Sequence, residues 1–191
     1  FMTCLIHQAS AQKSYFQQRV DTRIWVTLHD GDHSLSALEE ITYQNNSNQS
    51  LDRIYFHLWP NAYRSNRTAL ARQTLQNGKR GLYYAEPKDQ GFIDSLAFSV
   101  NGKLVKWEIL NEDTPDVAIV YLPQSLSPGE KIVISTPFHV KLPASFSRMG
   151  HIDQRYQITQ WYPKPAVFDH QGWNPIPYLD QGEFYSEFGS F

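Results

Sequence analysis

The chain has 191 residues, which is enough for one domain with a hydrophobic core and too few for two complete domains. Hydrophobic residues make up 41% and charged residues 19%, as in globular proteins, while 14% aromatic residues and 11 prolines favour β structure with shaped loops. The formal net charge of -2, with no basic run longer than two residues, gives no footprint for nucleic acid or an anionic membrane, so we expect neither partner.

The first eleven residues predict export. Ala9-Ser10-Ala11 has the small-x-small form of a signal-peptidase cleavage site after a short apolar stretch. We therefore interpret residues 1–11 as the remnant of an export signal peptide, residues 12–191 as one domain, and the protein as periplasmic or secreted. The alternative is an N-terminus that is apolar by chance. Because no run of about 18 apolar residues occurs in the chain, we expect no membrane span.

The first third of the chain predicts an antiparallel meander of three strands. Residues 19–29 alternate between apolar and polar side chains, which is typical of a half-buried strand. After the turn Asp30-Gly31-Asp32, residues 33–45 resume an extended pattern, and the polar cluster 45–50 indicates a second turn. Residues 51–59 then predict a third strand that pairs with the second.

A helix and a loop interrupt this pattern. Residues 68–77 are rich in helix formers, begin with a Thr and end before Gly78, so they predict one short helix with an N-cap and a glycine stop. Residues 81–91 have no strand alternation and predict an aromatic loop.

Further strands are predicted in the middle of the chain. Asn101-Gly102, between residues 92–100 and 103–110, is the strongest short hairpin signal in the sequence. Residues 117–122 and 131–142 predict two more strands around a Pro-Gly turn. The pattern predicts an all-β fold, an antiparallel β-sandwich or a saddle-shaped sheet with one short helix. The last residues begin one more extended segment, so we expect the domain to be cut from a longer polypeptide.

Residues 156–180 stand out by composition, because they contain two of the five Trp and four of the 11 Pro. We predict a rigid aromatic loop carried by a strand, and such loops often carry function.

The sequence offers no self-contained active site. It has neither His-Glu-x-x-His nor a Cys pair, so we expect no metal and no cofactor in this chain. Adjacent strand residues point to opposite faces, so Glu39 and Glu40 cannot act as a catalytic pair, and solvated strand charges are the expected interpretation. Because no nucleophile pairs with a base, we also disfavour a complete enzyme of another type.

Five motifs carry a resemblance to a known family. They follow one another in a fixed order: Tyr43-x-Asn45, residues 56–63 (Phe-His-Leu-Trp-Pro-Asn-Ala-Tyr), 85–91 (Ala-Glu-Pro-Lys-Asp-Gln-Gly), 159–164 (Thr-Gln-Trp-Tyr-Pro-Lys) and 182–185 (Gly-Glu-Phe-Tyr). In this order they resemble the N-terminal domain of zinc aminopeptidases of the aminopeptidase N and leukotriene hydrolase family, above all exported Bacteroidetes-type members. The likeness covers nearly the whole chain from about residue 16 onward.

The resemblance implies a non-catalytic domain. In that family a saddle-shaped N-terminal β-domain docks on a catalytic domain that supplies the zinc ligands, the general base and the transition-state Tyr, none of which this chain contains. Zinc would belong to the full-length parent, and the chain alone should not hydrolyse peptides. Its partners would be its own catalytic domain and the N-termini of peptide substrates.

The resemblance also implies site residues. The N-terminal domain of the family lends the cleft a short Gln-x-Glu or Gln-x-Gln segment, and Gln160 matches its first Gln. Tyr162 stands where the family often has Glu or Gln, and it offers an aromatic face and a hydroxyl in place of a charge. On strand geometry Gln160 and Tyr162 would face a common cleft, although plain packing is the alternative for both.

Three aromatic residues of the loop, Trp161, Trp173 and Tyr178, are interpreted as packing against the missing domain. We therefore expect an unusually large exposed apolar patch that includes residues 161–178. The competing hypothesis is a free-standing β-sandwich that binds a glycan or a protein through this loop. Glycan platforms tend to expose coplanar rings, whereas a docking fragment should pack its rings edge to face.

Overall fold

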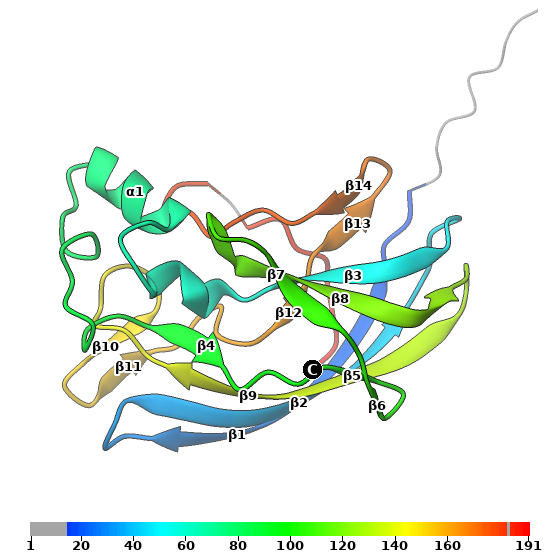
Figure 1. Ribbon diagram of the computed structural model, residues 1–191, viewed down its shortest axis with the longest axis horizontal. Coiled ribbons are helices and arrows are strands. Elements are labelled where there is room, and N and C mark those ends of the chain that lie inside the picture. Colours follow the sequence, from blue (N-terminus) through cyan, green and yellow to red (C-terminus); the bar gives the residue numbers. More distant parts are fainter. Residues whose placement is uncertain (1–14, 183) are drawn as a thin grey trace, which may run out of the picture.

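The computed structural model of the protein describes residues 15–182 and 184–191. The expected export signal at residues 1–11 lies outside this part of the chain. Two β-sheets form the body of the fold, with the helix and two small hairpins at their margins (Figure 1). The prediction of an all-β fold with one short helix is therefore confirmed.

The larger sheet has six strands, and every pairing between them is antiparallel. Its order is β1 (Arg19–His29), β2 (Ser34–Gln44), β9 (Lys131–Lys141), β5 (Ser99–Val100) and β6 (Lys103–Leu104), with β4 (Phe92–Asp94) also paired to β9. The smaller sheet runs in the order β12 (Lys164–Pro165), β3 (Leu51–His57), β8 (Thr114–Leu126) and β7 (Trp107–Asn111). Two hairpins complete the fold: β10 (Gly150–Ile152) with β11 (Arg155–Gln157), and β13 (Val167–Asp169) with β14 (Gly172–Asn174).

The core lies between the two sheets. The expected alternation of β9 is confirmed, because its inward side chains are buried while their neighbours are more exposed. Phe56 on β3 and Phe98 just before β5 join the layers, with ring centroids 5.0 Å apart. Burying aromatic rings of this size supplies a large share of the hydrophobic stabilisation.

The predicted three-stranded meander is wrong. β1 and β2 pair as expected, but β2 pairs next with β9, and β3 lies in the other sheet. Asn45 explains the crossing: its buried side-chain amide donates to the carbonyls of Gln49 (2.7 Å) and Leu126 (2.9 Å). The turn after β2 is thereby fixed to the end of β8 in the smaller sheet, and the chain continues there as β3.

The hairpin at Asn101-Gly102 is confirmed at its turn. Both residues have positive φ, 49° and 78°, as a type I′ turn requires. The long strands expected on either side are wrong, because β5 and β6 contain two residues each. Ser95, at φ 58°, breaks the first strand. After β6 the chain crosses to the smaller sheet as β7.

The predicted helix is confirmed as α1 (Ala69–Gln76). The hydroxyl of its N-cap Thr68 accepts from the Ala71 backbone N–H at 3.2 Å and donates to the Ala62 carbonyl at 2.7 Å. Gly78 follows the helix at φ 81°. Before α1, the third predicted strand ends at His57, and the short 3-10 helix η1 (Trp59–Tyr63) follows with Pro60 in its first turn. Within residues 15–182 and 184–191, no helix has the length and apolarity needed to cross a membrane.

Candidate functional site

The segment 158–163 links β11 to β12 and carries both predicted cleft residues. It is not a strand, and Gln160 has a φ of 56°, so the expected strand alternation of Gln160 and Tyr162 is wrong. The segment is anchored at Thr159, whose hydroxyl donates to the Arg148 carbonyl at 2.6 Å. Pro163 limits the backbone at its other end.

Gln160 is half-buried and strained. A non-glycine residue in the left-handed region costs about 1–2 kcal/mol. Its side-chain amide has no hydrogen-bond partner among the residues that the structure describes. The amide therefore does not serve the local fold, and its donors and acceptor are available to another molecule.

Trp161 and Tyr162 hold this segment against the larger sheet and the C-terminal residues. The Trp161 ring packs on Phe138 of β9 at 5.8 Å and meets the Tyr162 ring edge to face at 5.6 Å. Tyr162 also meets Phe191 edge to face at 5.9 Å. Burial, together with the carboxyl group of Glu39, raises the pKa of Tyr162 to about 12, so its hydroxyl stays protonated at neutral pH.

Beside Tyr162 is a small cavity that contains two ionisable groups. Its volume is ≈ 40 Å³, which is room for about one water molecule, and Lys164 and Glu187 line it. Burial lowers the pKa of Lys164 and raises the pKa of Glu187 to about 7. Lys164 on β12 lies opposite His57 on β3 in the strand register. Burial is the main cause that lowers the pKa of His57 to about 3, and the positive charge of Lys164 is the second.

The expectation that Glu39 is a solvated strand charge is wrong. It is 1% exposed on the inward face of β2, and neither carboxylate oxygen has a hydrogen-bond partner in the described part of the chain. Burial without a partner raises its pKa well above the ordinary value. The alternation of β2 could have found this residue, because Leu35, Ile41 and Tyr43 share its parity and are buried.

Glu40 has the opposite parity on β2 and is only partly buried, so the expectation that the two carboxylates cannot act as a pair is confirmed. Its neighbours in register are Arg23 on β1 and Ser135 on β9.

Tyr178 packs inside this domain. It is 1% exposed, its hydroxyl accepts from the Tyr63 hydroxyl at 3.2 Å, and its backbone N–H donates to Asp116 at 2.6 Å. Trp173 is half-buried on the β13–β14 hairpin, with its ring 5.0 Å from Phe168. This hairpin was not expected, because the prolines on both sides obscure its two short strands.

The exposed apolar surface does not centre on the aromatic loop, contrary to expectation. Within residues 161–178, one large apolar side chain is exposed, that of Ile176. The β1–β2 hairpin of the larger sheet carries four exposed large apolar side chains. Trp161 and Tyr162 lie at 74° to each other and are half-buried, so these two rings do not form the coplanar platform that the glycan-binding alternative requires.

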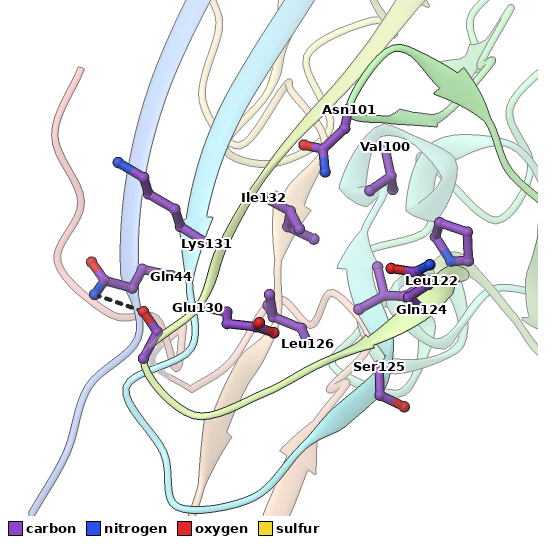
Figure 2. A pocket seen from close by; sticks show the side chains of 12 residues that line it. Gln44, Val100, Asn101, Leu122, Gln124, Ser125, Leu126, Glu130, Lys131 and Ile132 are labelled. Atoms are coloured by element: carbon purple, nitrogen blue, oxygen red, sulfur yellow. Dashed lines mark hydrogen bonds between the residues drawn. The ribbon is translucent and has the colours of Figure 1, made fainter.

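A larger cavity of ≈ 490 Å³ opens between the sheets at another place (Figure 2). The apolar side chains of Val100, Leu122, Leu126 and Ile132 surround it, and polar residues form its rim. Glu130 at this rim is already engaged, because its carboxylate accepts from the Ser127 backbone N–H at 2.8 Å. None of the residues of the 158–163 segment lines this cavity, and the sequence predicts no functional role for the residues that do.

The described residues offer no zinc site. Among residues 15–182 and 184–191, no three His, Cys, Asp or Glu side chains are grouped so that they could hold a metal ion. His151, which lies two residues before Asp153, uses its Nδ1 in a 3.2 Å contact with the Asp153 backbone carbonyl.

No model of a protein family matches this chain, and no curated protein sequence matches it. Among solved structures, it is similar to M1 zinc metallopeptidases. The enzyme from Deinococcus radiodurans has 18% sequence identity and a TM-score of 0.40, over 68% of this chain and 22% of that chain. A two-domain M1 zinc metallopeptidase mutant with bound L-arginine has 15% identity and a TM-score of 0.41, over 86% and 29%. The chain thus spans less than a third of the length of these proteins. Similarity this weak leaves the function to be argued from the residues.

Proposed function

We propose that this chain is the non-catalytic N-terminal domain of an exported zinc aminopeptidase, and that it contributes Gln160 and Tyr162 to the pocket for the substrate's N-terminus. The observation that carries the proposal is the unpartnered amide of Gln160, in a segment that resembles the cleft-lining segment of that family. The ordered motifs at residues 43–45, 56–63, 85–91 and 182–185 support the same family.

The contacts of the segment support a binding role for Gln160. Its neighbours are fixed: Thr159 is hydrogen-bonded to Arg148, and Trp161 is packed on Phe138. A strained residue between two fixed neighbours is held in place before a ligand arrives, which lowers the entropy cost of binding. Its amide oxygen can accept a hydrogen bond from a protonated α-amine.

Tyr162 supplies a different kind of contact. Since the pKa of its hydroxyl is raised to about 12, it presents a neutral hydroxyl and an aromatic ring at neutral pH. A cation can be bound by the face of such a ring, but with less electrostatic attraction than a carboxylate provides. The pocket should therefore depend less on ionic strength than one with Glu at this position.

The chemistry of hydrolysis belongs elsewhere in the longer polypeptide. When bound to such a catalytic domain, zinc polarises the scissile carbonyl and activates water. The residues of this chain would bind and orient the amine end of the peptide, while Trp161 and Trp173 would pack near the domain boundary. Export would place the enzyme in the periplasm or outside the cell.

The reading frame beyond Phe191 tests the proposal. A continuing frame that encodes His-Glu-x-x-His and a downstream Glu is the expected result. A stop codon directly after Phe191 would contradict it. A continuing frame without the zinc motif would contradict the peptidase assignment as well.

A further inference from the structure

The outer edge of the larger sheet is only partly paired. β1 is its terminal strand and pairs on one side with β2 over all eleven residues (Figure 1). On the other side, Ser190 forms an isolated parallel bridge with Asp21. The Ser190 N–H donates to the Val20 carbonyl at 3.0 Å, and the Thr22 N–H donates to the Ser190 carbonyl at 2.8 Å.

These two bonds identify the backbone groups that face the free edge. Along a strand, alternate residues direct their N–H and C=O groups to the same side. Because Val20 and Thr22 bond Ser190, the corresponding groups of Ile24, Val26 and Leu28 face the same edge. Among the described residues nothing pairs with these three on that side. A long unpaired edge of this kind is normally covered or protected by charge.

The side chains along the inward face of this edge are mainly apolar, and one exposed apolar pair lies on the outward face. Val26 and Leu28 have the inward parity of buried Thr22, yet they are 48% and 44% exposed. On the outward face, Trp25 and its cross-strand partner Leu38 are 56% and 47% exposed. The core-facing side of the sheet is therefore unfinished at this end, and on the outward face the Trp25–Leu38 pair lies between the polar residues Arg23 and Thr27 of β1.

We propose that the free edge from Thr22 to Leu28 receives a further strand, parallel to β1, formed by the polypeptide that directly follows Phe191. This inference rests on the proposed function, in which the chain is part of a longer polypeptide. The bridge at Ser190 already fixes the direction and the register of the added strand. Phe191 lies beside Thr22 in this register, and its ring meets the Tyr162 ring edge to face at 5.9 Å while 82% of the residue stays exposed.

The register predicts the pattern of the added strand. Its third, fifth and seventh residues after Ser190 come to lie beside Ile24, Val26 and Leu28, on the inward face. These positions should carry apolar side chains that cover the exposed parts of Val26 and Leu28. The fourth residue lies beside Trp25 on the outward face. The strand would also anchor Phe191 against Tyr162, and so support the segment that carries Gln160.

Amide hydrogen exchange tests the added strand. The chain ending at Phe191 is compared with the same chain continued through the next eight or so natural residues. We expect the amides of Ile24, Val26 and Leu28 to exchange at least about 10-fold more slowly in the continued chain. The amides of Trp25 and Thr27, which face β2, serve as the internal control and should change little.

Two variants and two outcomes complete the test. In the continued chain, Val26→Pro removes an N–H that faces the edge without removing a hydrogen bond to β2. The amides of Ile24 and Leu28 should therefore exchange faster in this variant. Val26→Thr keeps the N–H, so it should keep their slow exchange. Equal exchange of the three amides in both chains would overturn the added strand even if the frame encodes the zinc motif. Protection that appears in the chain ending at Phe191, and rises with its concentration, would overturn it in favour of a second copy. A reading frame that ends at Phe191 would contradict both the added strand and the proposed function.

Discussion

Replacing His57 should make the protein more resistant to acid. His57 is 2% exposed, its Nδ1 has no hydrogen-bond partner in the described part of the chain, and its ring stacks on Trp59 at 4.6 Å. Burial and the Lys164 charge lower its pKa from 6.5 to about 3. In the unfolded chain the imidazole gains a proton below about pH 6.5, while in the folded protein it stays neutral until about pH 3.

The sign and the size follow from linkage. The folded pKa is depressed, so the unfolded state binds more protons and stability falls as the pH falls below 6.5. At about pH 5 the unfolded imidazole is some 1.5 pH units below its pKa, and at about 1.36 kcal/mol per unit the loss is roughly 2 kcal/mol. His57→Phe keeps a flat ring against Trp59 and removes the unpaired nitrogen, so this loss should disappear.

The assay is urea unfolding at about pH 7.5 and about pH 5, for the parent chain, His57→Phe and the exposed control His170→Gln. Other groups also titrate in this range, so the informative quantity is the difference between variant and parent. The fall in unfolding free energy between the two pH values should be smaller by roughly 2 kcal/mol in His57→Phe. The control should follow the parent. An equal fall in His57→Phe and the parent would refute the assignment of a buried neutral imidazole.

Two further predictions concern stability. Glu39→Leu should raise the unfolding free energy at neutral pH, because it removes a buried carboxyl without partners. Since the pKa of Glu39 is raised in the folded protein, the gain in unfolding free energy should shrink as the pH falls toward 4.5. A gain independent of pH would refute this cause. Thr68→Ala should lower thermal stability by about 1 kcal/mol through loss of the helix cap, while Thr68→Ser should retain most of it. Equal melting temperatures for the two variants would contradict the capping role.

The sequence patterns that predicted structure correctly were local. Asn101-Gly102 specified its turn because both φ angles must be positive, and Thr68 with Gly78 specified the limits of α1. Strand alternation identified the inward face of β9. Alternation specifies which face is buried but not which strand lies beside it, and so it could not show that β3 crosses to the smaller sheet through the bonds of Asn45.

The candidate site was predicted less completely than the fold. Gln160 and Tyr162 are candidates only through the resemblance at residues 159–164, and the positive φ of Gln160 could not be predicted, because nothing in its residue type demands that conformation. Glu39 was missed as a neighbour of Tyr162, since a charged residue was assumed to be solvated. Tyr178 was assigned to a domain surface because its partners, Tyr63 and Asp116, are distant in sequence.

The kinetics of Gln160→Ala in the full-length aminopeptidase that we propose test the binding role of this domain most directly. Loss of a hydrogen bond to the substrate's ammonium group, worth about 1.5 kcal/mol, should raise KM for a free-amine aminoacyl substrate about 10-fold. The matched control is Gln157→Ala, an exposed residue on β11. We expect a raised KM for Gln160→Ala and parental values for Gln157→Ala. A KM for Gln160→Ala equal to that of the parent would contradict the proposal that this domain helps to bind the substrate's N-terminus.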